Sequence, residues 1–118
     1  MGKELHATYQ CSEAPVLLSV LIGNGQFGGS AVFVGESSNP VAVDNQIMQL
    51  NVGNGAELVG SEVFVKSIVS DTNDMTNKMI VRYILEGGPT KNMFQLTDEV
   101  DEDGESSTFR ATFQFELA

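Results

Sequence analysis

The feature that most constrains the fold is the strict alternation of apolar and polar side chains, which is clearest near the C-terminal end. From Phe109 to Leu117 the odd positions are apolar and the even positions are polar or charged. Successive side chains of an extended strand point to opposite faces, so this pattern predicts a strand with one buried face. Residues 3–11 alternate in the same way, with Tyr9 and Cys11 on the apolar face. No segment repeats its apolar residues at the helical period.

Other short segments, apolar on one or both faces, are separated by turns rich in Gly, Asn, Asp and Pro. We expect strands at 3–11, 16–22, 29–34, 46–52, 61–70, 78–85, 93–97 and 109–117, with a short edge strand at 41–43. Regularly spaced short strands predict an all-β fold. We therefore expect a single-domain antiparallel β-sandwich of about eight strands over residues 1–118, with a β-barrel as the alternative. The immunoglobulin pattern is missing, because the chain has one Cys and no Trp.

A strand–turn–strand pattern occurs twice in the chain. Residues 23–34 and 53–65 share Gly-Asn-Gly, then Gly-Ser, then Val-Phe-Val, with one additional residue in the second copy. Asn-Gly tolerates the positive φ angles of tight turns between antiparallel strands, so each copy is predicted to be a β-hairpin and the pair an internal duplication. A phosphate-binding reading is disfavoured, since such loops open a helix and β-branched residues follow here.

The charge balance limits the classes of partner. Sixteen acidic and six basic residues give a formal net charge of -10, which repels nucleic acid and anionic membrane surfaces. No apolar run approaches the roughly 20 residues of a membrane span, so membrane insertion is not expected. The start of the chain has no apolar signal region, and a bacterial envelope or secreted location is expected only if a signal segment has been removed. The sequence does not indicate an oligomeric state.

The acidic run from Asp98 to Glu105 is the strongest candidate for a metal site. It fits the first half of a Ca²⁺-binding EF-hand loop, but the position that requires a bidentate Glu is Arg110. We therefore expect a solvated acidic loop without a structural metal. A Ca²⁺ site of another kind, built from Asp98, Asp101 and Asp103, is the alternative.

His6 and Cys11 are the only His and the only Cys, so no internal disulfide can form. Their separation of five positions is odd, so on one strand they point to opposite faces and cannot act as a nucleophile and base pair. We expect Cys11 to be a core residue and His6 to lie at the surface. Most acidic residues fall in loops, which disfavours a paired-carboxylate cleft. The sequence predicts no catalytic, cofactor-binding or metal-binding residues and no enzyme activity.

Two functions remain from the sequence. The first is a non-catalytic interaction module that presents loops or a sheet edge to a protein partner. The alternative is a small-ligand or carbohydrate-binding sandwich, assisted by Ca²⁺. Carbohydrate binding usually uses exposed aromatic side chains, and exposure of Tyr9 or Tyr83 would favour it. We expect most of the aromatic residues to face inward: Tyr9, Phe33, Phe64, Tyr83, Phe109, Phe113 and Phe115.

Overall fold

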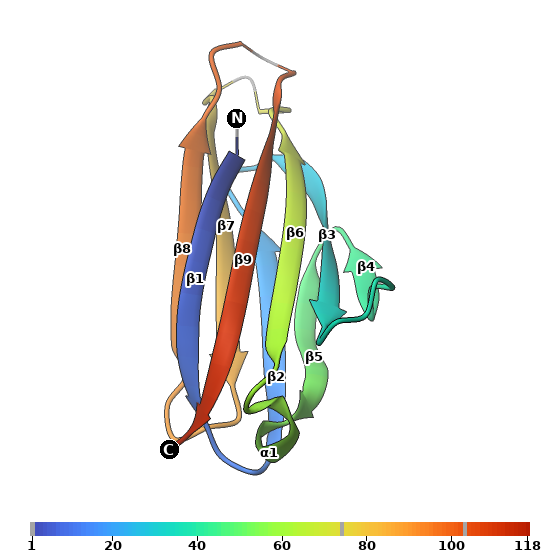
Figure 1. Ribbon diagram of the computed structural model, residues 1–118. Coiled ribbons are helices and arrows are strands. Elements are labelled where there is room, and N and C mark those ends of the chain that lie inside the picture. The colour runs from blue at the N-terminus through green and yellow to red at the C-terminus, as the bar shows by residue number, and fades with distance from the viewer. Residues whose placement is uncertain (1, 74, 103) are drawn as a thin grey trace.

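A computed structural model describes residues 2–73, 75–102 and 104–118. The described residues form nine strands and one short helix (Figure 1). In chain order these are β1 (Gly2–Cys11), β2 (Pro15–Ile22), β3 (Phe27–Val34), β4 (Ala42–Asp44), β5 (Ile47–Asn54), α1 (Gly55–Leu58), β6 (Glu62–Ser70), β7 (Lys78–Glu86), β8 (Asn92–Glu99) and β9 (Ser106–Leu117). The predicted β-sandwich is confirmed, and the short edge strand is present as β4.

Two sheets pack face to face. The five-stranded sheet has the order β1-β9-β6-β3-β4, and the four-stranded sheet has the order β5-β2-β7-β8. All neighbouring strands are antiparallel except β1 and β9, which run parallel from Gly2 beside Thr108 to Cys11 beside Leu117. In Figure 1 the five-stranded sheet faces the viewer and the four-stranded sheet lies behind it.

The core lies between the sheets, and the alternation of the strands fills it. Tyr9 and Cys11 of β1 are fully buried, as are Tyr83 of β7 and Phe113 of β9. Phe113 contacts aromatic rings of the opposite sheet, with centroid distances of 5.7 Å to Tyr83 and 5.6 Å to Phe94. Apolar burial is the main stabilising contribution to a fold that has no disulfide.

A small polar group interrupts this apolar core. The hydroxyl oxygens of Ser30 and Ser67, on neighbouring strands of the five-stranded sheet, are 2.6 Å apart and buried. The Tyr83 hydroxyl is also buried; it lies near the Ser67 hydroxyl but makes no hydrogen bond of normal geometry among the described residues. Burial raises the pKa of Tyr83, and the nearby Ser67 hydroxyl offsets only part of that rise.

The prediction of two hairpins is wrong. β2 and β5 belong to the four-stranded sheet, whereas β3 and β6 belong to the five-stranded sheet, so each copy crosses from one sheet to the other. In the first copy Asn24 and Gly25 have φ angles of 59° and 69°, which is the turn chemistry that Asn-Gly predicts. Buried Gln26 then holds the crossing in place, because its side-chain amide oxygen accepts hydrogen bonds from the backbone N–H groups of Thr72 and Asn73.

The second copy has a different conformation although it shares the Gly-Asn-Gly letters. Asn54 is extended, with φ of -77°, and α1 follows it. Leu58 of this helix is buried in the core. The helix packs so closely on the β1–β2 connection that a Cβ atom at Gly55 would lie 1.7 Å from the Ser12 carbonyl oxygen. The second copy therefore packs a helical turn in the place where the first copy has a tight turn.

Alternation also fails at Met48, and three side chains expected to face inward lie outside the core: Leu117, Phe33 and Phe64. Met48 is exposed, because β5 is irregular next to β2 and Gln49 has a positive φ of 49°, which breaks the alternation. Leu117 is exposed at the end of β9. Phe33 and Phe64 are half-buried on the outer face of the five-stranded sheet, because their neighbours Val32, Val63 and Val65 take the inward positions.

Candidate functional site

The outer face of the five-stranded sheet brings together aromatic, basic and acidic side chains that are distant in the sequence. The strand register aligns its outward side chains in rows that cross the sheet. One row holds Phe33 of β3 opposite Phe64 of β6, which lies opposite Thr112 of β9. The rings of Phe33 and Phe64 are 6.0 Å apart and tilted by 35°. We call the row of Phe33, Phe64 and Thr112 the aromatic row.

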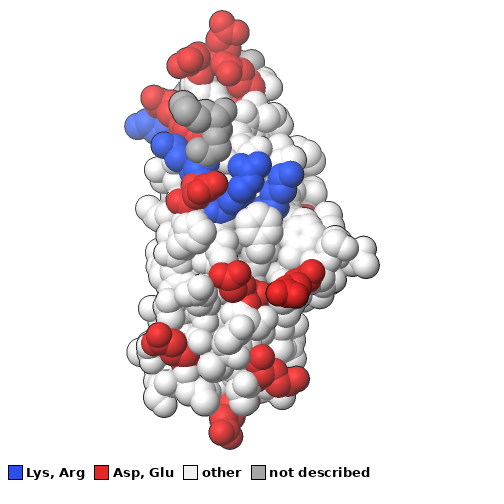
Figure 2. Space-filling model, in the orientation of Figure 1, with Lys and Arg blue, Asp and Glu red and all other residues white. Residues whose placement is uncertain are grey.

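A basic row lies next to the aromatic row on one side. Lys66 of β6 is directly opposite Arg110 of β9, two positions along the strand from Phe64 and Thr112. Neither forms an ion pair among the described residues, although Glu4 is beside Arg110 in the register. Like charges directly opposite each other on a sheet cost on the order of a few tenths of a kcal/mol. Figure 2 shows the blue side chains in the upper half of this face.

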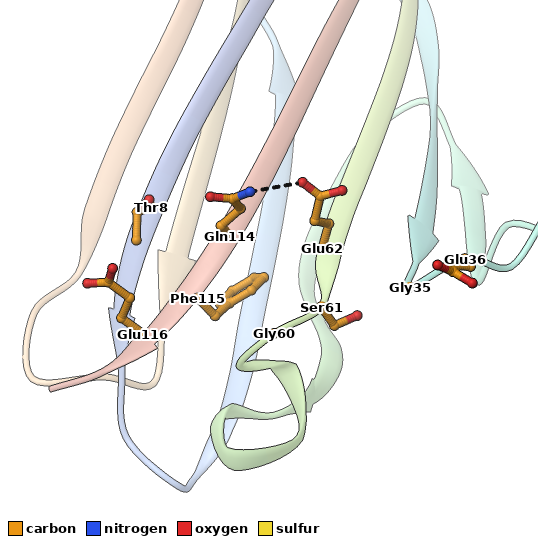
Figure 3. A pocket seen from close by; sticks show the side chains of 9 residues that line it. All are labelled: Thr8, Gly35, Glu36, Gly60, Ser61, Glu62, Gln114, Phe115 and Glu116. Atoms are coloured by element: carbon orange, nitrogen blue, oxygen red, sulfur yellow. Dashed lines mark hydrogen bonds between the residues drawn. The ribbon is translucent and has the colours of Figure 1, made fainter.

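A polar hollow lies on the other side of the aromatic row. It has a volume of about 580 Å³, and three carboxylates line it: Glu36 after β3, Glu62 of β6 and Glu116 of β9. Gln114 donates a hydrogen bond of 3.1 Å to Glu62, so these two side chains point toward one another across the strands (Figure 3). The face therefore carries Lys66 and Arg110 on one side of the aromatic row and three carboxylates on the other.

Further apolar side chains lie on the same face, on the side of the aromatic row that carries Lys66 and Arg110. We define the apolar patch as Phe27, Ala31, Phe33, Val43, Phe64 and Ile68. In the register Ala31 lies between Lys66 and Val43, and Ile68 lies one row further along, opposite Gly29. Phe27, Val43 and Ile68 are 58%, 68% and 48% exposed. Exposed apolar side chains gathered on one face of a sheet are a candidate interaction site.

The two candidate nucleophile residues lie where their parity predicts. Cys11 is buried, and its Sγ lies 3.3 Å from the Glu116 carbonyl oxygen and 3.7 Å from that of Gly55. His6 is exposed on the outer face of β1. The structure therefore does not bring His6 and Cys11 together, and Cys11 is confirmed as a core residue.

The acidic run Asp98–Glu105 connects β8 to β9 and so passes from one sheet to the other. The Asp98 carboxylate accepts the Ser107 hydroxyl and the Glu99 backbone N–H. The loop also pairs with its neighbour, because the Gly104 N–H donates to the Asp71 carbonyl and the Asp71 N–H donates to the Glu105 carbonyl, both at 2.9 Å. Asp103, one of the alternative Ca²⁺ ligands, lies outside the described residues.

The glycine-rich segments are turn and packing positions in the structure. Asn24 and Gly25 form the tight turn, and Gly55 provides the close helix contact. Within residues 2–73, 75–102 and 104–118 no cluster of His, Cys, Asp and Glu suits a metal ion. No helix in this described part is long and apolar enough to cross a membrane.

Sequence reasoning missed the outer-face site because it assigned Phe33 and Phe64 to the interior. Parity alone could have corrected one of them, since Phe64 lies between Val63 and Val65 at an even position of a strand whose odd positions are buried. Comparison with known protein families, with curated proteins and with solved structures finds no match to this chain.

Proposed function

We propose that the protein is a non-catalytic interaction module that binds a protein partner through the outer face of its five-stranded sheet, at the β3–β4 edge. The observation that supports this most strongly is the apolar surface of this face, on which Phe27, Val43 and Ile68 are exposed and the Phe33–Phe64 pair is half-buried. Aromatic side chains on a rigid sheet contribute large contact areas at low entropic cost. A charged rim of Lys66, Arg110 and Glu62 would orient the partner.

A protein partner fits this face better than nucleic acid does. Only Lys66 and Arg110 make a basic pair on it, and the chain as a whole carries a formal charge of -10. Phosphate backbones need several cationic contacts, so the summed field would oppose their binding. The carbohydrate alternative loses the argument from Tyr9 and Tyr83, because both are fully buried.

The proposal is tested by partner capture with matched variants. Native protein is compared with Val43→Glu plus Ile68→Glu, which introduces two charges into the apolar patch. Met93→Glu is the control, because Met93 is equally exposed but lies on β8 in the other sheet. A protein bound by the native and control chains and lost by the patch variant supports the proposal. Equal binding by all three chains would place the interaction elsewhere.

A further inference from the structure

We propose that this face binds a second copy of the chain, packed face to face and antiparallel about a two-fold axis that runs along the Phe33–Phe64 row. This inference rests on the proposed interaction function and names the partner. The axis lies between the two faces and is perpendicular to the strands. It therefore places each strand over the same strand of the second copy, with its direction reversed.

The argument is the charge pattern on either side of the aromatic row. Lys66 and Glu62 lie on the same strand, on opposite sides of the axis at Phe64 and two positions from it. A half-turn about that axis therefore places Lys66 of each copy over Glu62 of the other. On β9 the same operation places Arg110 over Gln114, next to Glu116. The contact is self-complementary, as a two-fold interface requires.

The polar hollow provides the space that the basic side chains need. Its lining of Glu36, Glu62 and Glu116 is acidic, and it begins one row beyond the aromatic row. Rows on one strand are about 6.8 Å apart, which is within the reach of a Lys or Arg side chain that projects from the facing sheet. Lys66 and Arg110 make no ion pair within their own described chain, so docking would supply carboxylate partners for both.

The same charges disfavour a two-fold axis that runs parallel to the strands over β6. Such an axis would keep each row at its own level, so that Lys66 of each copy would face Lys66 of the other. That arrangement is repulsive, and like-charge contacts of this kind select against wrong partners and wrong orientations. The antiparallel arrangement instead places the basic row of each copy over the acidic side of the other.

The net charge of -10 does not oppose the antiparallel contact strongly. Most acidic residues outside the face lie in the end loops, and Figure 2 shows one group of red side chains at the end that carries the β8–β9 loop. The molecule is 44 Å long, and antiparallel packing sends the two β8–β9 loops to opposite ends of the pair. At physiological salt, charges separated by more than about 8 Å are largely screened, so these two loops hardly interact.

The test is a charge exchange at one pair of positions. Native protein, Lys66→Glu and Glu62→Lys are each examined by sedimentation equilibrium up to about 1 mM, which is the weak end of the affinity scale. Native protein should be a dimer, and each variant should raise the dissociation constant about tenfold or more, because like charges then meet at both contacts. Both residues are exposed, so the variants should fold, which circular dichroism checks.

The decisive arm mixes the two single variants in equal amounts. The introduced glutamate of the first variant would then face the introduced lysine of the second, and the unchanged Glu62 of the first would face the unchanged Lys66 of the second. Heterodimers should therefore form, and labelling one variant with heavy nitrogen lets native mass spectrometry resolve them. A chain that carries both substitutions should also dimerise again. Lys91→Glu, which makes the same charge change on the β7–β8 connection, should leave the dimer intact.

Each contrary result has a distinct meaning. A native chain that stays monomeric overturns the second-copy proposal, and if a different protein is still captured through the apolar patch, the interaction function survives. A dimer that is unaffected by Lys66→Glu forms through another surface. Variants that weaken the dimer but fail to pair with each other overturn the antiparallel register.

Discussion

Phe33 and Phe64 lie directly opposite each other in the β3–β6 ladder, with ring centroids 6.0 Å apart. Each is the middle residue of one of the two Val-Phe-Val segments. β2 likewise pairs antiparallel with β5, so the two strand–turn–strand segments are neighbours in both sheets. The two segments therefore run in opposite directions in each sheet, although their turns differ. An origin of these segments by duplication stays a prediction.

The position of Phe113 predicts a large loss of stability on truncation. Phe113→Ala should lower the free energy of unfolding by about 3–5 kcal/mol, because the residue is fully buried between Tyr83 and Phe94. Urea unfolding at equilibrium measures the loss. Phe33→Ala is the matched control, since the same side chain is removed from the outer face, and it should cost about 1 kcal/mol. Equal costs for the two variants would contradict the assignment of the two faces.

Gly28 and Gly29 should respond in opposite ways to the same substitution. A Cβ atom at Gly28 would lie 2.3 Å from the Ile68 carbonyl oxygen and 2.9 Å from Val69 Cα, so Gly28→Ala must displace backbone. At Gly29 the nearest atom is the Asp44 carbonyl oxygen at 3.7 Å, which is an ordinary contact. We expect Gly28→Ala to cost about 2 kcal/mol or more and Gly29→Ala to be neutral or mildly stabilising. Thermal melts of both variants decide it, and a neutral Gly28→Ala would show that β3 and β6 can separate at little cost.

Tyr83 should make stability depend on pH in the alkaline range. Burial raises the pKa of Tyr83 above the ordinary value of 10.0 that applies to the unfolded chain. Its contribution is therefore complete below pH 10 and is lost as the pH rises above it, because only the unfolded chain then releases the proton. The loss is about 1.4 kcal/mol per pH unit.

The comparison uses Tyr83→Phe, which keeps the ring and removes the titrating group. At neutral pH this variant should be as stable as the native protein or slightly more stable, because the buried hydroxyl makes no hydrogen bond of normal geometry among the described residues. From about pH 9 to about pH 11 the native protein should lose about 1 kcal/mol more than the variant in urea unfolding. Parallel pH profiles would show that the Tyr83 hydroxyl ionises normally.

The acidic run Asp98–Glu105 should not bind Ca²⁺ selectively. The Asp98 carboxylate is engaged by the Ser107 hydroxyl and the Glu99 N–H, and the position of the bidentate ligand is Arg110. Thermal melts with Ca²⁺, Mg²⁺ or EDTA at equal ionic strength should give the same midpoint for both ions, since screening of a charge of -10 does not distinguish them. A rise specific to Ca²⁺, lost on Asp101→Asn with Asp103→Asn, would establish a metal site by mass action.

The sequence predicts the strands well because alternation is a local property. The inward faces of β1, β7 and β9 follow it, including Tyr9, Tyr83 and Phe113. It fails at Met48, where the irregular pairing with β2 changes the phase, and pairing is a property of two strands. The crossing of each Gly-Asn-Gly segment between sheets could not be read locally either, because a strand–turn–strand pattern is the same whether or not its strands pair.

The candidate site could not be predicted because register assembles it. Glu36, Glu62 and Glu116 are distant in sequence, and the hollow exists only because β6 lies between β3 and β9. Lys66 and Arg110 likewise meet through the β6–β9 pairing. Local patterning could indicate that Phe64 faces outward, but it could not show that Phe33 would stand opposite it.

The parallel pairing of β1 with β9 determines how the molecule would respond to mechanical force. Gly2 lies at one end of this strand pair, and the Ala118 N–H is bonded to the Cys11 carbonyl at the other end (Figure 1). Tension applied between the two ends of the chain would slide β1 and β9 past each other in shear. The hydrogen bonds along the pair would then share the load together instead of opening one after another, so extension should meet its main resistance at this first contact.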